Sequence, residues 1–373
     1  MRLAVAAIAV GVLVASLGGV TADAAASADP PPITELSWSP NGKWLAFLVD
    51  ERASGSSTSL SVVRLDRTVQ RRVVRLTSPG AALYGIAWSP DSRRLAVRSY
   101  DLAGDTRTLI SGANGLDLRQ LDGRLDDWAP DSRRLALCRS GSLYVVDSRS
   151  GVSRLLVQGC GARWSPNGAR IAFSRTTSRS QTRIFSVDSS GGDLRQLGAE
   201  PAMAAQQNLV GWSRESTRIA YYEGRPFDGF TQAYVAPADG SRQATAIAQA
   251  AYLVLWSPGG RRLAVRDFAK TGVSIVSPDG ATMASIPDAE QDFAWGPGGG
   301  SLVFTGKDGV YAVRTTSPNL PARVAPGSLP AWSKLGWIAV AHRGSCAGGG
   351  ERVFVVRPNG KRFHALSRCR PTS

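Results

Sequence analysis

The chain has 373 residues, of which 43% are hydrophobic, and its 44 basic and 29 acidic residues give a formal net charge of +15. This hydrophobic content is ordinary for a globular protein, and the length alone would accommodate two or three domains. The two histidines and four cysteines lack the spacing of a zinc site, and no Asp-x-Asp-x-Asp-Gly calcium loop is present, so we expect no metal and no cofactor.

The N-terminal segment has the pattern of a secretory signal peptide. Arg2 precedes an uncharged apolar run, Leu3–Val20, and small residues follow it. We expect cleavage after one of the residues from Ala24 to Ala28, so that residues 1–28 are removed and residues 29–373 form one domain. The alternative is an uncleaved anchor, because the run is near the length that spans a bilayer. No later stretch could cross a membrane, and we expect a secreted, periplasmic or cell-wall associated protein.

Eight tryptophans recur along the chain, and similar residues surround most of them. Their spacings are 50, 40, 36, 48, 44, 39 and 37 residues. A period near 40 built from short strands is typical of a β-propeller with one four-stranded blade per repeat. We predict an all-β propeller of antiparallel blades over residues 33–370, with eight blades, or seven if one of the divergent last repeats forms no blade. The tryptophans are Trp38, Trp88, Trp128, Trp164, Trp212, Trp256, Trp295 and Trp332.

Each repeat predicts four strands. An extended apolar segment leads into the Trp, as in residues 85–88, and Ser-Pro-Asp/Asn-Gly/Ser then predicts a turn. A second strand follows, as in 94–97; a third often ends in Asp, as in 143–147; a fourth carries Arg and Leu, as in 73–76. We expect the Trp rings to fill gaps between adjacent sheets rather than to bind a ligand. We also expect the ring to close by packing between blades, without a blade that mixes strands from both termini.

The cysteines predict two disulfides in an oxidising compartment. In the third repeat, Cys138 ends the second strand and Cys160 follows the fourth; in the eighth repeat, Cys346 and Cys369 have the same arrangement. The ends of strands two and four lie on the same face of an antiparallel blade. We therefore predict the bonds Cys138–Cys160 and Cys346–Cys369, the second of which would tether the C-terminus to its own blade.

The pattern Trp-Ser-Pro-Asp/Asn-Gly/Ser-x-Arg/Lys-Leu/Ile-Ala-Phe/Val resembles the WD40-like repeat of TolB-type β-propellers. The match is clear in six repeats and weak in the last two. The resemblance implies the fold and says little about function. TolB carries an additional domain before its propeller, and prolyl oligopeptidase and dipeptidyl peptidase relatives append an α/β-hydrolase domain. This chain lacks a Gly-x-Ser-x-Gly nucleophile elbow, so we expect a stand-alone propeller without peptidase activity.

No residue is assigned a catalytic role. We expect the two histidines, His342 and His364, to lie at strand ends or edges rather than in a catalytic triad. Acidic residues on loops around the central mouth could act in pairs, as in glycosidases, although we expect them to be solvated loop charges. These acids are Asp126 with Asp127, Glu290 with Asp292, Asp101 with Asp105, and Glu223 with Asp228.

A positional pattern of charge is the most suggestive functional feature. The turn between the first and second strands carries basic residues in six repeats, and repetition places them on one rim as a footprint for an anionic partner. Alternatively, each arginine solvates its turn or pairs with a neighbouring acid such as Asp91 or Asp131, and the Arg-rich composition reflects a GC-rich genome. This basic rim consists of Lys43, Arg93, Arg94, Arg133, Arg134, Arg170, Arg218, Arg261 and Arg262.

These observations favour an exported, non-catalytic propeller that acts as a monomer and binds a protein or an anionic cell-envelope polymer. Loops on the opposite face, above all the aromatic-rich stretch 221–230, are further candidates for recognition. Export argues against nucleic acid as the natural ligand. The alternative is an enzyme that acts on carbohydrate or a small molecule through mouth-loop carboxylates.

Overall fold

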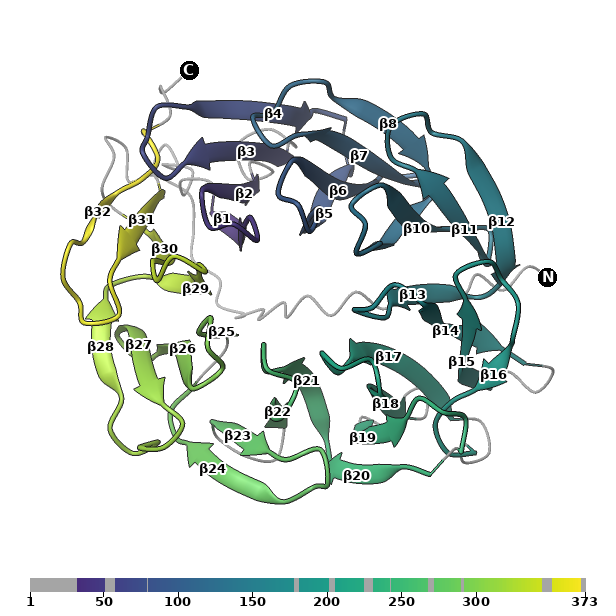
Figure 1. The fold of residues 1–373 in the computed structure, drawn as a ribbon. Coiled ribbons are helices and arrows are strands. Elements are labelled where there is room, and N and C mark those ends of the chain that lie inside the picture. Colours follow the sequence, from purple (N-terminus) through teal and green to yellow (C-terminus); the bar gives the residue numbers. More distant parts are fainter. Residues whose placement is uncertain are drawn as a thin grey trace, which may run out of the picture.

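The described strands form a ring of blades around a common centre (Figure 1). Each blade has four antiparallel strands, the first nearest the centre and the fourth at the rim. The predicted all-β propeller of four-stranded blades is therefore confirmed. The computed structural model describes residues 32–50, 58–78, 80–177, 181–200, 205–224, 231–241, 243–267, 272–289, 292–343 and 351–369.

Within these residues the strands fall into eight groups of four. The first four blades comprise β1 (Ile33–Trp38), β2 (Trp44–Asp50), β3 (Thr58–Arg64) and β4 (Gln70–Leu76); β5 (Ala82–Trp88), β6 (Arg94–Tyr100), β7 (Thr106–Gly112) and β8 (Arg119–Asp122); β9 (Arg124–Trp128), β10 (Arg134–Arg139), β11 (Ser142–Asp147) and β12 (Ser153–Gln158); β13 (Cys160–Trp164), β14 (Arg170–Thr176), β15 (Thr182–Asp188) and β16 (Arg195–Gln196).

The other four blades follow the same order. One parallel pair, Thr182 with Gln206, additionally joins blades four and five. The strands are β17 (Gln206–Trp212), β18 (Arg218–Gly224), β19 (Thr231–Pro237) and β20 (Thr245–Ala248); β21 (Ala251–Trp256), β22 (Leu263–Asp267), β23 (Val273–Val276) and β24 (Thr282–Ile286); β25 (Phe293–Trp295), β26 (Ser301–Gly306), β27 (Gly309–Arg314) and β28 (Ala322–Ala325); β29 (Ser328–Trp332), β30 (Ile338–His342), β31 (Arg352–Val356) and β32 (His364–Ala365).

The turn after the tryptophan has one backbone conformation in all eight groups. The fourth residue after each Trp has a φ between 62° and 76°, in the left-handed region that favours glycine. Three of these positions hold serine, and the hydroxyl compensates for the strain by linking blades. The backbone N–H of Asn41 donates to Ser92 Oγ at 2.9 Å, and that of Asp91 donates to Ser132 Oγ at 2.9 Å.

One hydrophobic cluster lies at each interface between neighbouring groups of described strands. The cluster between blades one and two, for example, joins Ala46 and Leu60 to Leu95 and Val97. The other clusters join successive blades in the same way, and the last joins blade eight to blade one. Each sheet is therefore buried on both faces by its neighbours, so the stability of one blade depends on the next.

The tryptophan rings lie in these interface clusters, as predicted, and most also make a directional bond. Six indole nitrogens donate to the preceding blade, each to the carbonyl of the residue just before that blade's own Trp. Trp88 Nε1, for instance, lies 3.0 Å from the carbonyl oxygen of Ser37. The indole nitrogens of Trp164 and Trp332 are buried and have no hydrogen-bond partner. The interfaces before blades four and eight thus lack this bond.

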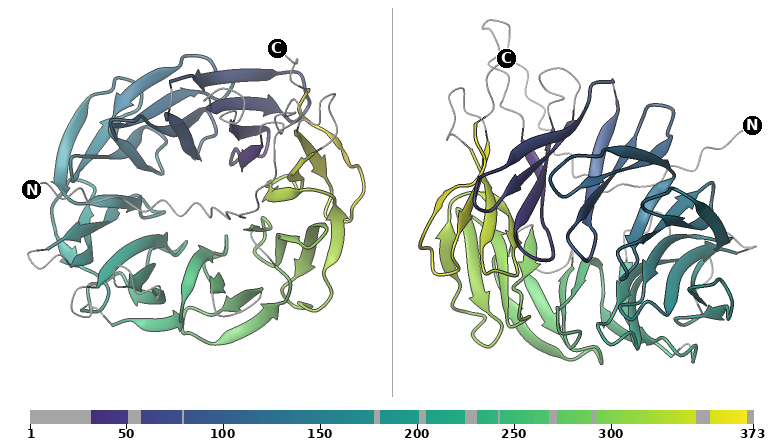
Figure 2. Two further views of the ribbon diagram at one scale, coloured as in Figure 1. Left: turned by 180° about the vertical axis from the view of Figure 1, so that it is seen from behind. Right: turned by 45° about the horizontal axis from the view of Figure 1, so that its top comes forward.

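The ring closes by side-chain packing, as predicted, because no sheet of described strands combines strands from both ends of the chain. The first blade, purple, and the last, yellow, lie side by side in both further views (Figure 2). Trp38 Nε1 donates to the carbonyl of Ala331 at 3.1 Å, and the backbone N–H of Ile33 donates to Glu351 Oε2 at 2.5 Å. The cluster around Phe47 holds the two blades together.

The predicted disulfide Cys138–Cys160 is present, with Cα atoms 5.3 Å apart. Cys160 is the first residue of β13, because Gly159 alone separates that strand from β12, so the bond joins β10 of blade three to the inner strand of blade four. Cys369 is also disulfide-bonded, and its predicted partner, Cys346, lies outside the described residues.

The indole bond can be measured with a matched pair of variants. We expect Trp88→Phe to lower the free energy of unfolding by about 1–2 kcal/mol more than Trp164→Phe. Both changes remove similar buried ring area, but only Trp88→Phe leaves a carbonyl, that of Ser37, without its donor. Urea denaturation followed by circular dichroism gives both values. Equal losses would contradict a stabilising role for the bond.

The disulfide closes a loop with a sequence separation of 22 residues. We expect the double variant Cys138→Ser/Cys160→Ser to unfold with a free energy about 3 kcal/mol lower, chiefly because the unfolded chain gains freedom. Denaturation of wild type and variant without reductant measures this difference. A wild type that unfolds at the same urea concentration as the variant would show that the cross-link contributes nothing.

Candidate functional site

The basic rim contains two structurally different sets of residues. Five arginines stand six residues after their Trp, where the second strand begins; all are half-buried, and each contacts a partner. Arg218 forms an ion pair with Asp279 of the next blade at 3.0 Å, and Arg262 Nη1 donates to Thr315 Oγ1 at 2.8 Å. These arginines support the blades and their interfaces. The set is Arg94, Arg134, Arg170, Arg218 and Arg262.

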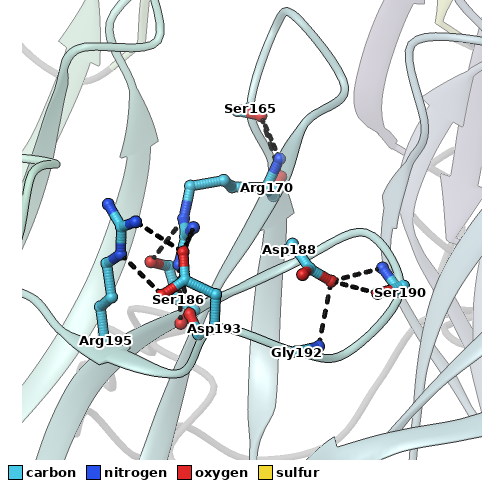
Figure 3. A network of polar contacts seen from close by, with 8 residues as sticks. All are labelled: Ser165, Arg170, Ser186, Asp188, Ser190, Gly192, Asp193 and Arg195. Carbon is cyan, nitrogen blue, oxygen red and sulfur yellow. Dashed lines mark hydrogen bonds and ion pairs between the residues drawn. The ribbon is translucent and has the colours of Figure 1, made fainter.

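Figure 3 shows the most extensive of these networks, in blade four. Arg170 Nη1 lies 2.7 Å from Asp193 Oδ2, its Nη2 donates to the carbonyl of Asp193, and its Nε donates to Ser186 Oγ at 3.1 Å. Arg195 pairs with the same carboxylate at 2.6 Å. The donors of Arg170 are therefore engaged within its own blade, so few of them remain for an anionic partner.

The other four rim residues remain available to solvent. Lys43, Arg93, Arg133 and Arg261 stand five residues after their Trp, and their side chains are exposed. None of them forms an ion pair with another described residue. The alternation follows from strand geometry, because successive side chains at the start of the second strand point to opposite sides.

Blade eight adds a basic surface that the sequence analysis missed. Residues 328–369 contain seven Lys or Arg and a single acid, Glu351. Arg357, Lys361 and Arg362 line a shallow hollow of about 490 Å³ beside Pro358 and Asn359, in the turn between β31 and β32. These cations lie on the third-to-fourth turn and so stand apart from the predicted basic rim, which was assigned to first-to-second turns. The seven are Lys334, Arg343, Arg352, Arg357, Lys361, Arg362 and Arg368.

One cation of this hollow is held in place. The guanidinium carbon of Arg357 lies 3.9 Å from the ring centroid of Trp337, and Arg357 Nη1 donates to the carbonyl of Leu335 at 2.9 Å. Stacking of this kind fixes a long side chain without neutralising its charge. The sequence does contain a signal for this surface, because three of the six residues 357–362, on the third-to-fourth turn of the eighth repeat, are Lys or Arg.

The prediction that Asp126 and Asp127 lie on a mouth loop was wrong. Both residues lie within β9. A β-bulge there turns both side chains toward the next blade. Asp126 Oδ2 accepts the backbone N–H of Ala162 at 2.9 Å, and Asp127 Oδ2 accepts that of Trp164 at 2.8 Å. Arg163 in turn donates to the carbonyl of Asp126. These carboxylates hold the interface between blades three and four.

Burial changes the acidity of two inner-strand carboxyls. It raises the pKa of Asp127 to about 6, although Arg163 and the N–H groups of Trp164 and Trp128 act in the opposite direction. Burial also raises the pKa of Glu35, whose carboxylate accepts the backbone N–H groups of Gly85 and Ile86 in the next blade. Such shifts occur at functional sites and in structural networks alike. Here both groups bond to a neighbouring blade's backbone, which indicates a structural role.

The remaining candidate acids do not gather into a site among the described residues. Asp292 directly precedes β25, and burial raises its pKa. Asp101 Oδ1 accepts the N–H groups of Ala103 and Asp105 and so shapes its own loop. Glu223 lies in β18 rather than on a loop and accepts a hydrogen bond from Gln207. Glu290 and Asp228 lie outside the described residues, as does most of the aromatic stretch, residues 225–230.

The histidines pack against aromatic rings. His342 ends β30 and lies 5.6 Å, between ring centroids, from Phe354; His364 in β32 lies 5.5 Å from Trp337. In the described part of the chain, no group of three or more His, Cys, Asp or Glu could hold a metal ion. Among the same residues, no helix is long and apolar enough to cross a membrane.

The chain matches no protein-family model and no curated protein sequence. Similar solved structures include dipeptidyl peptidase 4 from Porphyromonas gingivalis (TM-score 0.61, 10% identity, 89% of this chain and 59% of that chain). They include an oligogalacturonate lyase in complex with manganese (TM-score 0.52, 14% identity, 88% of this chain and 98% of that chain). They also include TolB from Acinetobacter baumannii (TM-score 0.46, 17% identity, 65% of this chain and 63% of that chain). This chain thus spans under two thirds of that TolB. With identities this low, the comparisons support the β-propeller fold alone.

The raised pKa of Asp127 predicts a pH dependence. The ordinary value is 3.8, so the folded protein holds this proton more tightly than the unfolded chain; the resulting stability is present below 3.8 and is lost as the pH rises through about 6. Between about pH 4 and about pH 8, we expect wild type to lose about 2 kcal/mol of unfolding free energy relative to Asp127→Asn. Urea denaturation of both proteins at the two pH values tests this. A difference that does not change with pH would contradict it.

Proposed function

We propose that this protein is an exported, non-catalytic propeller that binds an anionic partner, either a glycopolymer of the cell envelope or an acidic protein surface. The proposal rests on one observation: exposed cations without an acidic partner among the described residues recur on the turns of neighbouring blades. They are Lys43, Arg93 and Arg133 on blades one to three, with the basic turn of blade eight beside blade one and Arg261 on blade six.

The fold suits an extended anionic ligand. A propeller holds equivalent turns at fixed spacing, so a chain with regularly placed charges could contact several blades at once. Individual exposed charges contribute little, but several contacts on one rigid scaffold add up through effective concentration. The partnered arginines underneath keep the turns in place, because Arg94 of blade two reaches Ser148 of blade three and Arg218 of blade five reaches Asp279 of blade six.

Export is part of the proposal. We infer that residues 1–28 act as a signal peptide and that residues 29–373 form the mature domain. The disulfide Cys138–Cys160 supports this, because such bonds persist in oxidising compartments. An anionic polymer or protein of the cell envelope is a partner that such a protein would meet.

We favour binding over catalysis because of what the inner carboxylates do. Similar structures include enzymes, among them the oligogalacturonate lyase and the dipeptidyl peptidase. In this chain, however, Asp126 and Asp127 accept backbone N–H groups of blade four, and Glu35 accepts those of blade two. A carboxylate engaged in this way is poorly placed to act on a substrate.

The test compares two double variants with the same loss of charge. We expect wild type to bind polygalacturonate and isolated cell envelope in about 20 mM NaCl and to release both in about 300 mM NaCl, because salt screens exposed charges. Arg93→Ala/Arg133→Ala should weaken binding at least about fivefold, which corresponds to about 1 kcal/mol. The control Arg107→Ala/Lys307→Ala removes exposed cations beside the opposite connections, those between second and third strands, and should bind like wild type.

The outcomes separate the alternatives. Equal weakening by both double variants would mean that net charge alone governs binding and would refute a turn-specific surface. Binding that resists salt would point to an uncharged contact, and shortening of polygalacturonate during the assay would show catalysis; either result would overturn the proposal.

A further inference from the structure

We propose that the junction of blades one and eight contains a binding site for a phosphate group. A cavity of about 280 Å³ lies there, between the outer parts of the two blades. Arg67 and Gln70 line it from blade one, and Arg352, Ser367 and Arg368 line it from blade eight. The residues that line this cavity include none of the cations assigned to polymer binding, and the site does not depend on that proposal.

The charge of the cavity is unbalanced. Three guanidinium groups line it, and no carboxylate does. The nearest acids in the sequence are engaged elsewhere: Asp66 pairs with Arg64 at 3.3 Å, and Glu351 pairs with Arg343 at 2.8 Å. Three like charges in one concave site repel one another, so a bound anion would relieve that repulsion.

The site is partly preorganised. Arg352 donates from both Nε and Nη2 to the carbonyl of Ser367, at 3.1 and 2.9 Å, which fixes the plane of its guanidinium. The backbone N–H of Arg368 donates to Gln70 Oε1 at 2.6 Å, which ties the last described segment of blade eight to β4. The side chains of Arg67 and Arg368 form no ion pair with other described residues and keep their donors for a ligand.

A doubly charged tetrahedral oxyanion fits this arrangement best. Guanidinium groups bind phosphate oxygens through paired N–H donors, and donors from several directions suit a tetrahedral group better than a planar carboxylate. The volume far exceeds the roughly 10–15 Å³ that admits one water molecule. The cavity therefore has room for a phosphoryl group together with part of an organic carrier, as well as for free phosphate.

Binding here would act on ring closure. Blades one and eight share no strand, and a ligand held by Arg67 on one side and by Arg352 and Arg368 on the other would cross the junction. A ligand that binds only the closed, folded ring raises the stability of that state. Phosphate should thus raise the melting temperature and protect the backbone amides of β4 and β31 from exchange.

Inorganic phosphate is the probe for this site. We expect isothermal titration at constant ionic strength, with chloride as the reference salt, to show one saturable site per chain and a higher melting temperature in phosphate. Arg67→Gln/Arg368→Gln should weaken the affinity at least about tenfold. The control Arg107→Gln/Lys307→Gln removes the same charge at exposed residues outside both hollows and should change the affinity less than about twofold. Neither Arg67 nor Arg368 is buried, so the fold of the first double variant should persist.

Three results would overturn the site: equal thermal effects of phosphate and chloride, equal weakening by Arg67→Gln/Arg368→Gln and by Arg107→Gln/Lys307→Gln, or many weak sites without saturation. A titration with glucose 6-phosphate then tells a carried phosphoryl group from the free ion. If glucose 6-phosphate binds more tightly than inorganic phosphate, the rest of the cavity binds the organic part of a phosphorylated ligand. If the two affinities are equal, the site binds free phosphate. If the wild-type protein binds phosphate but not polygalacturonate, the result would count against the proposed function and not against the phosphate site.

Discussion

The hydrogen bond from a tryptophan indole to the carbonyl of the preceding blade, made at six of the eight interfaces, is the interaction on which most of the ring depends. The hydrophobic clusters bring sheets together but are not directional, so they would tolerate sliding of one blade against the next. The indole bond adds direction, because its donor and acceptor occupy the same place in successive repeats, as in Trp88 to Ser37 and Trp38 to Ala331. At the six interfaces where it forms, it therefore fixes the register of one blade against its neighbour, and one of the six is the junction of blades one and eight.

The two interfaces without this bond show how a repeat protein departs from its own rule. Between blades three and four, the bond is absent and three other links are present: the disulfide Cys138–Cys160 and the carboxylates of Asp126 and Asp127 on the backbone of β13. Ahead of blade eight, the ring of Trp332 packs close to Gly296, where most other blades carry serine. Where the indole bond is missing, blades three and four are thus linked by a disulfide and by carboxylate–backbone hydrogen bonds, and blades seven and eight have a close ring contact.

The fold was predictable because its determinants are local and repeated. A Trp followed by a turn whose fourth residue is left-handed specifies a strand, a turn and a strand without reference to distant residues. The cysteine pairing was predictable from the strand ends, but that the bond links two blades was not, because Cys160 is the first residue of β13. The bulge that buries Asp126 was also hidden, because bulges depend on cross-strand register. Strand alternation predicts that a basic residue five positions after the Trp is exposed and that one six positions after it is half-buried. The partner of the half-buried arginine can lie on another blade, and the sequence does not indicate which residue that is.

The distribution of charge then decides which surfaces can act on a ligand. The arginines at the sixth position direct their donors to acids, hydroxyls or carbonyls, so the number of basic residues overstates how many free donors a partner would meet. The unmatched cations divide by geometry into exposed turns and a concave junction. Cations on exposed turns make weak, salt-sensitive contacts, so tight binding there requires several such contacts at once. A cavity holding three guanidinium groups, one of them braced by Ser367, gives a single contact whose strength comes from convergence. One scaffold can therefore combine extended recognition of an anionic polymer with a discrete anion site at the point where its own ring closes.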